Sequence, residues 1–93
     1  MGDHAPAVAK ASIRDFLQRK VLKDRTLRDD ESFWETRAVD SLGIMQLIHF
    51  LETRFGISIP GRDMTSETFR SIDSVHAYVM RRIGEGTRRG SQR

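Results

Sequence analysis

The 93-residue sequence contains no cysteine. The chain can therefore form neither a disulfide nor a thiolate metal site, and redox chemistry gives no indication of its compartment. No apolar run approaches the roughly 20 residues that span a bilayer, and the N-terminal residues lack the basic and apolar regions of a signal peptide. We therefore expect a cytoplasmic protein with no membrane partner.

The length allows one domain, close to the lower limit for a fold without a metal or disulfide. Much of the formal net charge of +3 lies in residues 84–93, whose arginines show no apolar periodicity. Such a stretch is usually a solvated tail and not a nucleic-acid-binding arm. We predict a flexible N-terminus over residues 1–6, a folded domain over 7–83, a disordered basic tail over 84–93, and no nucleic-acid partner.

The spacing of apolar residues predicts three main helices. They span about residues 7–22, 40–55 and 71–83. Asp40 and Ser71 are suited to cap the last two helices at their starts, and Gly56 and Gly84 to end them.

The segments between these helices carry few signs of regular structure. Residues 24–39 read as a long ordered loop that is anchored by apolar side chains, namely Leu27, Phe33 and Trp34. Residues 57–61 alternate like a strand, but Pro60 ends that stretch before it could pair. About one helical turn fits residues 65–70, with Phe69 as its anchor. The prediction is an all-α domain of three main helices and one short helix.

Ser41 lies in the first turn of the second main helix, directly after the long loop. The first-turn N–H groups lack intrahelical partners and the helix dipole is positive there, so a phosphate ester on Ser41 would be stabilised. Taken alone, a serine at a helix start is ordinarily a capping residue.

Around Ser41 the sequence resembles the acyl carrier and peptidyl carrier protein family, whose pattern is Asp-Ser-Leu at the start of the second helix. The resemblance runs from about Ile13 to Ile83 and rests on Asp40-Ser41-Leu42, Leu47, Leu51-Glu52, Arg54-Phe55-Gly56-Ile57, Ile59-Pro60, Asp63, Phe69, Ser71-Ile72 and Tyr78-Val79. It implies an acyl-carrier-protein-like four-helix bundle with a long loop between the first two helices.

The resemblance also implies a function. A phosphopantetheinyl transferase would use coenzyme A and Mg²⁺ to attach 4′-phosphopantetheine to Ser41, with Asp40 helping to position the reaction and Leu42 beside the arm. Since the chain has no cysteine, the thiol that holds the cargo must come from this arm. Expected partner contacts on the second helix are Gly43, Met45, Gln46 and His49.

On this reading the protein is a free-standing, monomeric carrier without catalytic or metal-binding residues. It shuttles a thioester-bound acyl or aminoacyl group between a loading ligase and downstream transferases. Its second helix is nearly neutral, whereas typical fatty-acid carriers have an acidic one, so we expect recognition by shape and apolar contact in a specialised pathway. Phe50 stands where the family often has a small residue, which favours small or exposed cargo.

Two departures from the family pattern concern the loop before Ser41. Ala38 stands where glycine is common and Arg37 where an apolar residue is frequent, so the loop is expected to take a somewhat different path.

Two other functions are compatible with a small helical domain. An unmodified protein-interaction domain of the same fold, in which Ser41 only caps a helix, is the main alternative, and a small DNA-binding helical domain comes third. The best-defined helix has almost no basic residues, which argues against DNA recognition. His49 lies roughly 12 Å from Ser41 along the helix axis, too far to act as its base. A second Asp-Ser pair, Asp73-Ser74, falls inside the last predicted helix.

Overall fold

The computed structural model describes residues 5–91, with side chains through residue 85, and contains no strand within that range. Its elements are α1 (Pro6–Phe16) with a π-helical continuation η2 (Leu17–Leu22), the short α2 (Phe33–Thr36), α3 (Ser41–Phe55), the 3₁₀ turn η3 (Gly61–Asp63) and α4 (Ile72–Ser91). The predicted all-α fold of the acyl-carrier-protein type is confirmed.

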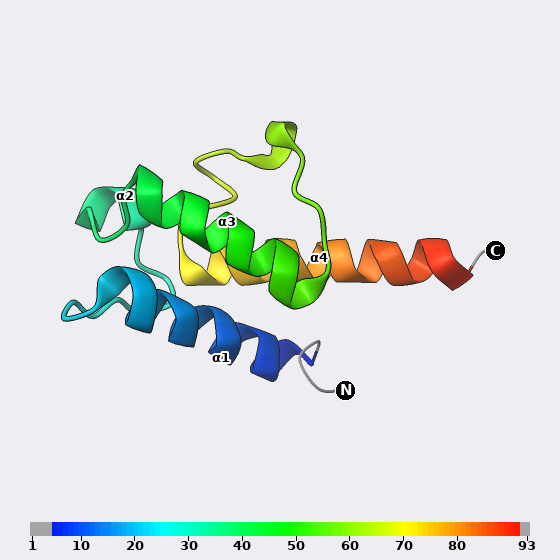
Figure 1. The fold of residues 1–93 in the computed structure, drawn as a ribbon, viewed down its shortest axis with the longest axis horizontal. Coiled ribbons are helices and arrows are strands. Elements are labelled where there is room, and N and C mark those ends of the chain that lie inside the picture. Colours follow the sequence, from blue (N-terminus) through cyan, green and yellow to red (C-terminus); the bar gives the residue numbers. More distant parts are fainter. Residues whose placement is uncertain (1–4, 92–93) are drawn as a thin grey trace.

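The three long helices pack side by side (Figure 1). α1 runs antiparallel to α3, whereas α4 points the same way as α3 because residues 56–71 return along the bundle before α4 begins. Every long helix contributes fully buried apolar side chains to one core, among them Ile13, Leu47, Leu51, Val75 and Val79. As a result, α3 begins at the end of the bundle opposite to the start of α1.

The predicted caps of the two later helices are confirmed. Asp40 Oδ1 accepts a hydrogen bond from the Gly43 N–H at 2.8 Å, and Ser71 Oγ accepts one from the Ser74 N–H at 3.1 Å. Gly56 ends α3 with a φ of +64°, a left-handed conformation that glycine adopts without strain. Local signals therefore fix the start and the end of the helix that carries Ser41.

The fourth helix lies elsewhere than predicted. Residues 65–70 make a single turn, in which the Phe69 N–H donates to the Thr65 carbonyl at 3.1 Å. The short helix is α2, inside the expected loop, where Ser32 Oγ accepts hydrogen bonds from the Trp34 and Glu35 N–H groups. Ser32 followed three residues later by Glu35 is a helix-start pattern, and it is the local signal in the sequence for this short helix.

The predicted loop anchors hold in part. Leu27 and Phe33 are buried, but the side chain of Trp34 is 39% exposed. Its indole Nε1–H donates to the Ser66 carbonyl at 3.0 Å, so Trp34 joins α2 to the later loop across the surface. The hydrogen bond of the indole N–H therefore holds the Trp34 side chain at the surface.

α4 does not end at Gly84 as predicted, and it continues to Ser91. Gly84 lacks the positive φ that a terminating glycine adopts, and a glycine inside a helix costs only about 1 kcal/mol relative to alanine. The structure thus gives residues 84–91 as a continuation of α4, in the range for which a disordered tail is predicted. Residues 1–4 of the predicted flexible N-terminus and residues 92–93 of the tail lie outside the described range.

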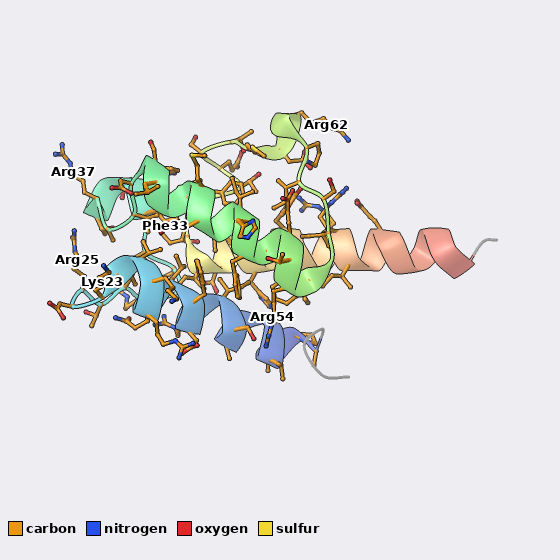
Figure 2. All side chains as sticks on the ribbon, in the orientation of Figure 1. Lys23, Arg25, Phe33, Arg37, Arg54 and Arg62 are labelled. Carbon is orange, nitrogen blue, oxygen red and sulfur yellow. The ribbon has the colours of Figure 1, made fainter. Side chains whose placement is uncertain are left out.

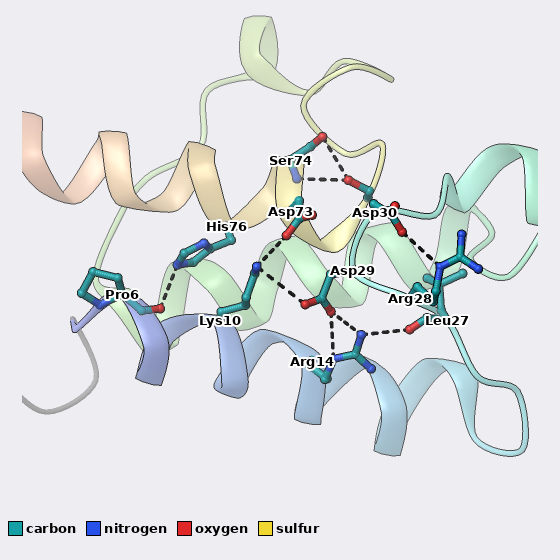
Figure 3. A network of polar contacts seen from close by, with 11 residues as sticks. Pro6, Lys10, Arg14, Leu27, Arg28, Asp29, Asp30, Asp73, Ser74 and His76 are labelled. Carbon is teal, nitrogen blue, oxygen red and sulfur yellow. Dashed lines mark hydrogen bonds and ion pairs between the residues drawn. The ribbon is translucent and has the colours of Figure 1, made fainter.

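A polar network ties α1 to the loop and to α4 (Figure 3). Lys10 Nζ lies 2.7 Å from Asp73 and 3.6 Å from Asp29, while Arg14 pairs with Asp29 and donates to the Leu27 carbonyl at 3.0 Å. The hydrogen bond from Arg14 lowers the pKa of Asp29, and the hydrogen bond with Asp73 raises the pKa of Lys10. These contacts hold the loop that precedes α2 against the bundle.

No helix within residues 5–91 is long and apolar enough to cross a membrane.

Candidate functional site

The site begins at the first residue of α3. Ser41 and Asp40 are both exposed, and Asp40 is the N-cap. Because the Asp40 carboxylate caps the helix, the Ser41 hydroxyl is not needed for that purpose. The arrangement argues against the alternative in which Ser41 is only a capping residue, and it leaves room for a substituent on Oγ.

The loop before α3 is held by a basic residue. Arg25 Nη2 donates to the Thr36 carbonyl at 2.9 Å, and its Nη1 donates to the Arg37 carbonyl at 3.1 Å. Arg37 ends α2 in the left-handed conformation, with a φ of +56°. The departure of Arg37 from the family pattern therefore coincides with a tight turn at the end of α2.

Three basic side chains gather at this end of the bundle. Figure 2 shows Lys23, Arg25 and Arg37 at the end where α3 begins. The positive end of the α3 dipole and the N–H groups of its first turn favour an anionic group such as a phosphodiester beside Ser41, and these basic side chains lie at the same end of the bundle. Lys23 and Arg25 precede α2 and Arg37 ends it, so their proximity to the start of α3 follows from the packing and not from the sequence pattern.

Gly43, which is predicted as a partner contact, is a packing position in this structure. It is buried, and a Cβ added there would lie 2.9 Å from Val21 Cγ1 and 3.0 Å from Val39 Cγ1. Contacts below 3.4 Å are tighter than ordinary carbon contacts, so a side chain would force these valines to move. Glycine thus lets the first turn of α3 approach η2 closely.

The other predicted contact residues surround an apolar groove. Met45 and Leu42 are 67% and 64% exposed, which is unusual for large apolar side chains. Met45, Gln46 and His49 line a groove of about 440 Å³ between α3 and the α1–η2 segment. We call this the α1–α3 groove; its other lining residues are Phe16, Lys20, Phe50 and Thr53.

Two aromatic rings belong to the α1–α3 groove. Phe16 and Phe50 stack with their centroids 4.4 Å apart and their planes 13° from parallel. Leu47 and Phe69, in contrast, are buried in the core. Phe50, whose size predicts small or exposed cargo, therefore stacks against α1 at the edge of the bundle.

Within residues 5–91, no hydrogen bond joins the Ser41 side chain to a histidine that could act as its base. His76 Nε2 lies 2.9 Å from the Pro6 carbonyl, at the end of the bundle where α1 begins (Figure 3). Ser74 lies inside α4, where it is hydrogen-bonded to Ser71. Among the described residues no group of three or more His, Asp or Glu side chains could hold a metal ion.

Comparison with known proteins agrees with this geometry. Residues 10–79 match the family described as "Phosphopantetheine attachment site". The chain is 25% identical over 71 residues to a D-alanyl carrier protein of Streptococcus suis, a match that covers 76% of this chain and 90% of that protein. It is 30% identical over 57 residues to aminoacyl carrier protein 2 of Bradyrhizobium diazoefficiens, which covers 57% of this chain and 64% of that protein.

Proposed function

Because this chain belongs to the phosphopantetheine attachment family of carrier proteins, we propose that Ser41 is the residue that bears its 4′-phosphopantetheine arm. Proteins of this kind hold an acyl or aminoacyl group as a thioester on the covalent arm and pass it between partner enzymes. The sequence contains no cysteine, so the thiol of the arm is the one available for this exchange.

The observation that carries the proposal is that Asp40, and not Ser41, caps α3. Asp40 caps α3 through its Oδ1, and the adjacent Ser41 presents an exposed hydroxyl at the positive end of the helix. A phosphopantetheinyl transferase would join Ser41 Oγ to the β-phosphorus of coenzyme A. The pyrophosphate bond breaks, adenosine 3′,5′-bisphosphate leaves, and a base of the transferase takes the serine proton. The new phosphodiester would lie beside the N–H groups of the first turn, which favour an anion.

We assign the protein a small aminoacyl cargo. Both relatives described above are named for amino-acid cargo. The apolar surface near Ser41 is an open groove, whereas Leu47 and Phe69 fill the interior. A specialised loading ligase and its downstream transferases would be the partners, and catalysis would reside in them. A cytoplasmic location and a monomeric state stay predictions from the sequence.

The attachment site is tested by incubating the protein with coenzyme A, Mg²⁺ and a broad-specificity phosphopantetheinyl transferase. Intact-mass measurement should show the gain of one arm in the wild-type protein and in Ser74→Ala, which alters the second Asp-Ser pair. Ser41→Ala should gain nothing. A mass gain that survives in Ser41→Ala, or no gain in the wild type, would refute the assignment.

A further inference from the structure

The α1–α3 groove begins about one turn beyond the attachment residue. Leu42, Met45 and His49 are spaced three and four residues apart, so they share one face of α3. The lining continues along this face to Thr53, which is twelve residues beyond Ser41 and roughly 18 Å away along the helix axis. The groove therefore forms an apolar track that leads away from the site along the surface of the bundle.

The chemistry of the groove suits a chain of alternating apolar and amide segments. Phe16 and Phe50 supply an apolar surface, and Met45 adds a flexible apolar wall. Gln46 offers an amide donor and acceptor, and His49 offers a ring nitrogen beside them. The volume of about 440 Å³ lies within the range of roughly 300 to 1,000 Å³ seen for small-molecule sites.

We propose that the α1–α3 groove is the resting place of the protein's own phosphopantetheine arm, which folds back from Ser41 along α3 when no partner enzyme holds it. This inference rests on the proposed attachment at Ser41. The pantetheine part of the arm contains two amide groups between short alkyl segments, which match the mixed lining, while its phosphate stays near the basic end of the bundle.

Covalent attachment makes weak binding sufficient. A tethered group reaches its site at an effective concentration in the millimolar range, so an affinity of about 1 mM would already fill the groove about half of the time. Such an arm leaves readily when a partner enzyme binds. An arm in the groove would cover Met45 between reactions, so that this large apolar side chain is not continuously exposed.

Amide NMR of the apo protein and of the protein loaded with the bare arm tests the proposal. Intact mass first establishes that the arm is present, which separates failure of docking from failure of attachment at Ser41. We expect chemical-shift changes at His49, Phe50 and Thr53 and, across the groove, at Phe16. Changes confined to residues 40–43 in a fully loaded sample would show a solvated arm and overturn the proposal.

The missing cysteine allows a second, independent measurement. A maleimide nitroxide label reacts only with the arm thiol of the loaded protein, because the chain has no thiol of its own. Paramagnetic broadening should be strong at Lys20 and Thr53 and weak at Met64, which does not line the groove. Equal broadening on both sides of the molecule would contradict docking.

A matched pair of variants completes the test. Met45 and Met64 are both exposed methionines, but only Met45 lines the α1–α3 groove. Met45→Glu should reduce the shift changes at His49 and Thr53 by at least half, and Met64→Glu should leave them unchanged. If both variants keep the wild-type shifts, or if the groove responds only when a loading enzyme is added, the groove is not the resting place of the arm.

Discussion

Replacing Asp40 by alanine would remove the hydrogen bond that starts α3. The Asp40 carboxylate accepts this bond from the Gly43 N–H at 2.8 Å. Loss of an N-cap costs about 1 kcal/mol, and loss of a negative charge near the helix start adds about 0.5 kcal/mol at an exposed position. At roughly 4 to 8 °C per kcal/mol for a domain of this size, Tm should fall by about 6 to 12 °C. Thermal unfolding followed by far-ultraviolet circular dichroism measures this change.

Asp40→Asn is the matched control because asparagine caps a helix about as well as aspartate. We expect its stability to stay within about 0.5 kcal/mol of the wild type. If the carboxylate also helps to position the loading reaction, transfer of the arm to the Asn variant should slow by about tenfold, equivalent to about 1.4 kcal/mol of transition-state stabilisation. Equal destabilisation of the two variants would refute the capping argument, and loading of the Asn variant at the wild-type rate would refute a role for the charge.

Two further predictions concern the core. Tyr78 is 3% exposed and donates to Asp63 Oδ2 at 2.7 Å; burial, and then this contact, raise its pKa to about 12 from an ordinary 10.0. The folded state therefore holds this proton more tightly, so stability is complete below pH 10 and should fall by roughly 2 to 3 kcal/mol between pH 10 and 12. Urea unfolding of Tyr78→Phe should not show this loss of stability between pH 10 and 12. If the variant loses stability with pH as steeply as the wild type, the effect does not come from Tyr78. Gly43→Ala should lower the free energy of unfolding by about 1 kcal/mol, because crowding against Val21 outweighs the gain in helix propensity; a rise in stability would show that Val21 yields freely.

Most of the fold could be predicted because its signals are local. Asp40, Gly56 and Ser71 act on the backbone within a few residues of themselves. The apolar stripe of α3, between Asp40 and Gly56, is recognised from helical spacing alone. The errors arose where two local patterns compete. The pattern around Gly84 predicts a helix end, although glycine is also tolerated inside a helix, and the polar residues around Ser32 predict a loop, although they also form a helix-capping pattern.

One side of the candidate site could also be predicted from the sequence, whereas the opposite side could not. Ser41, Leu42 and Met45 belong to one helix, so sequence alone places them together. The opposite wall of the α1–α3 groove comes from Phe16 and Lys20, and their proximity follows from how α1 packs on α3. Periodicity shows that each helix has an apolar face, but it does not show which exposed residues of two helices border the same surface.

The antiparallel course of the first helical segment has a practical consequence for handling the protein. Residues 6–22 run along roughly 25 Å of the bundle toward the end where α3 begins. A bead, a fluorophore or a fused protein joined ahead of α1 or beyond α4 would therefore be attached at the far end of the bundle (Figure 1). Immobilisation through either helix should leave Ser41 open to solution, so enzymes that act on it could be captured and studied on a surface.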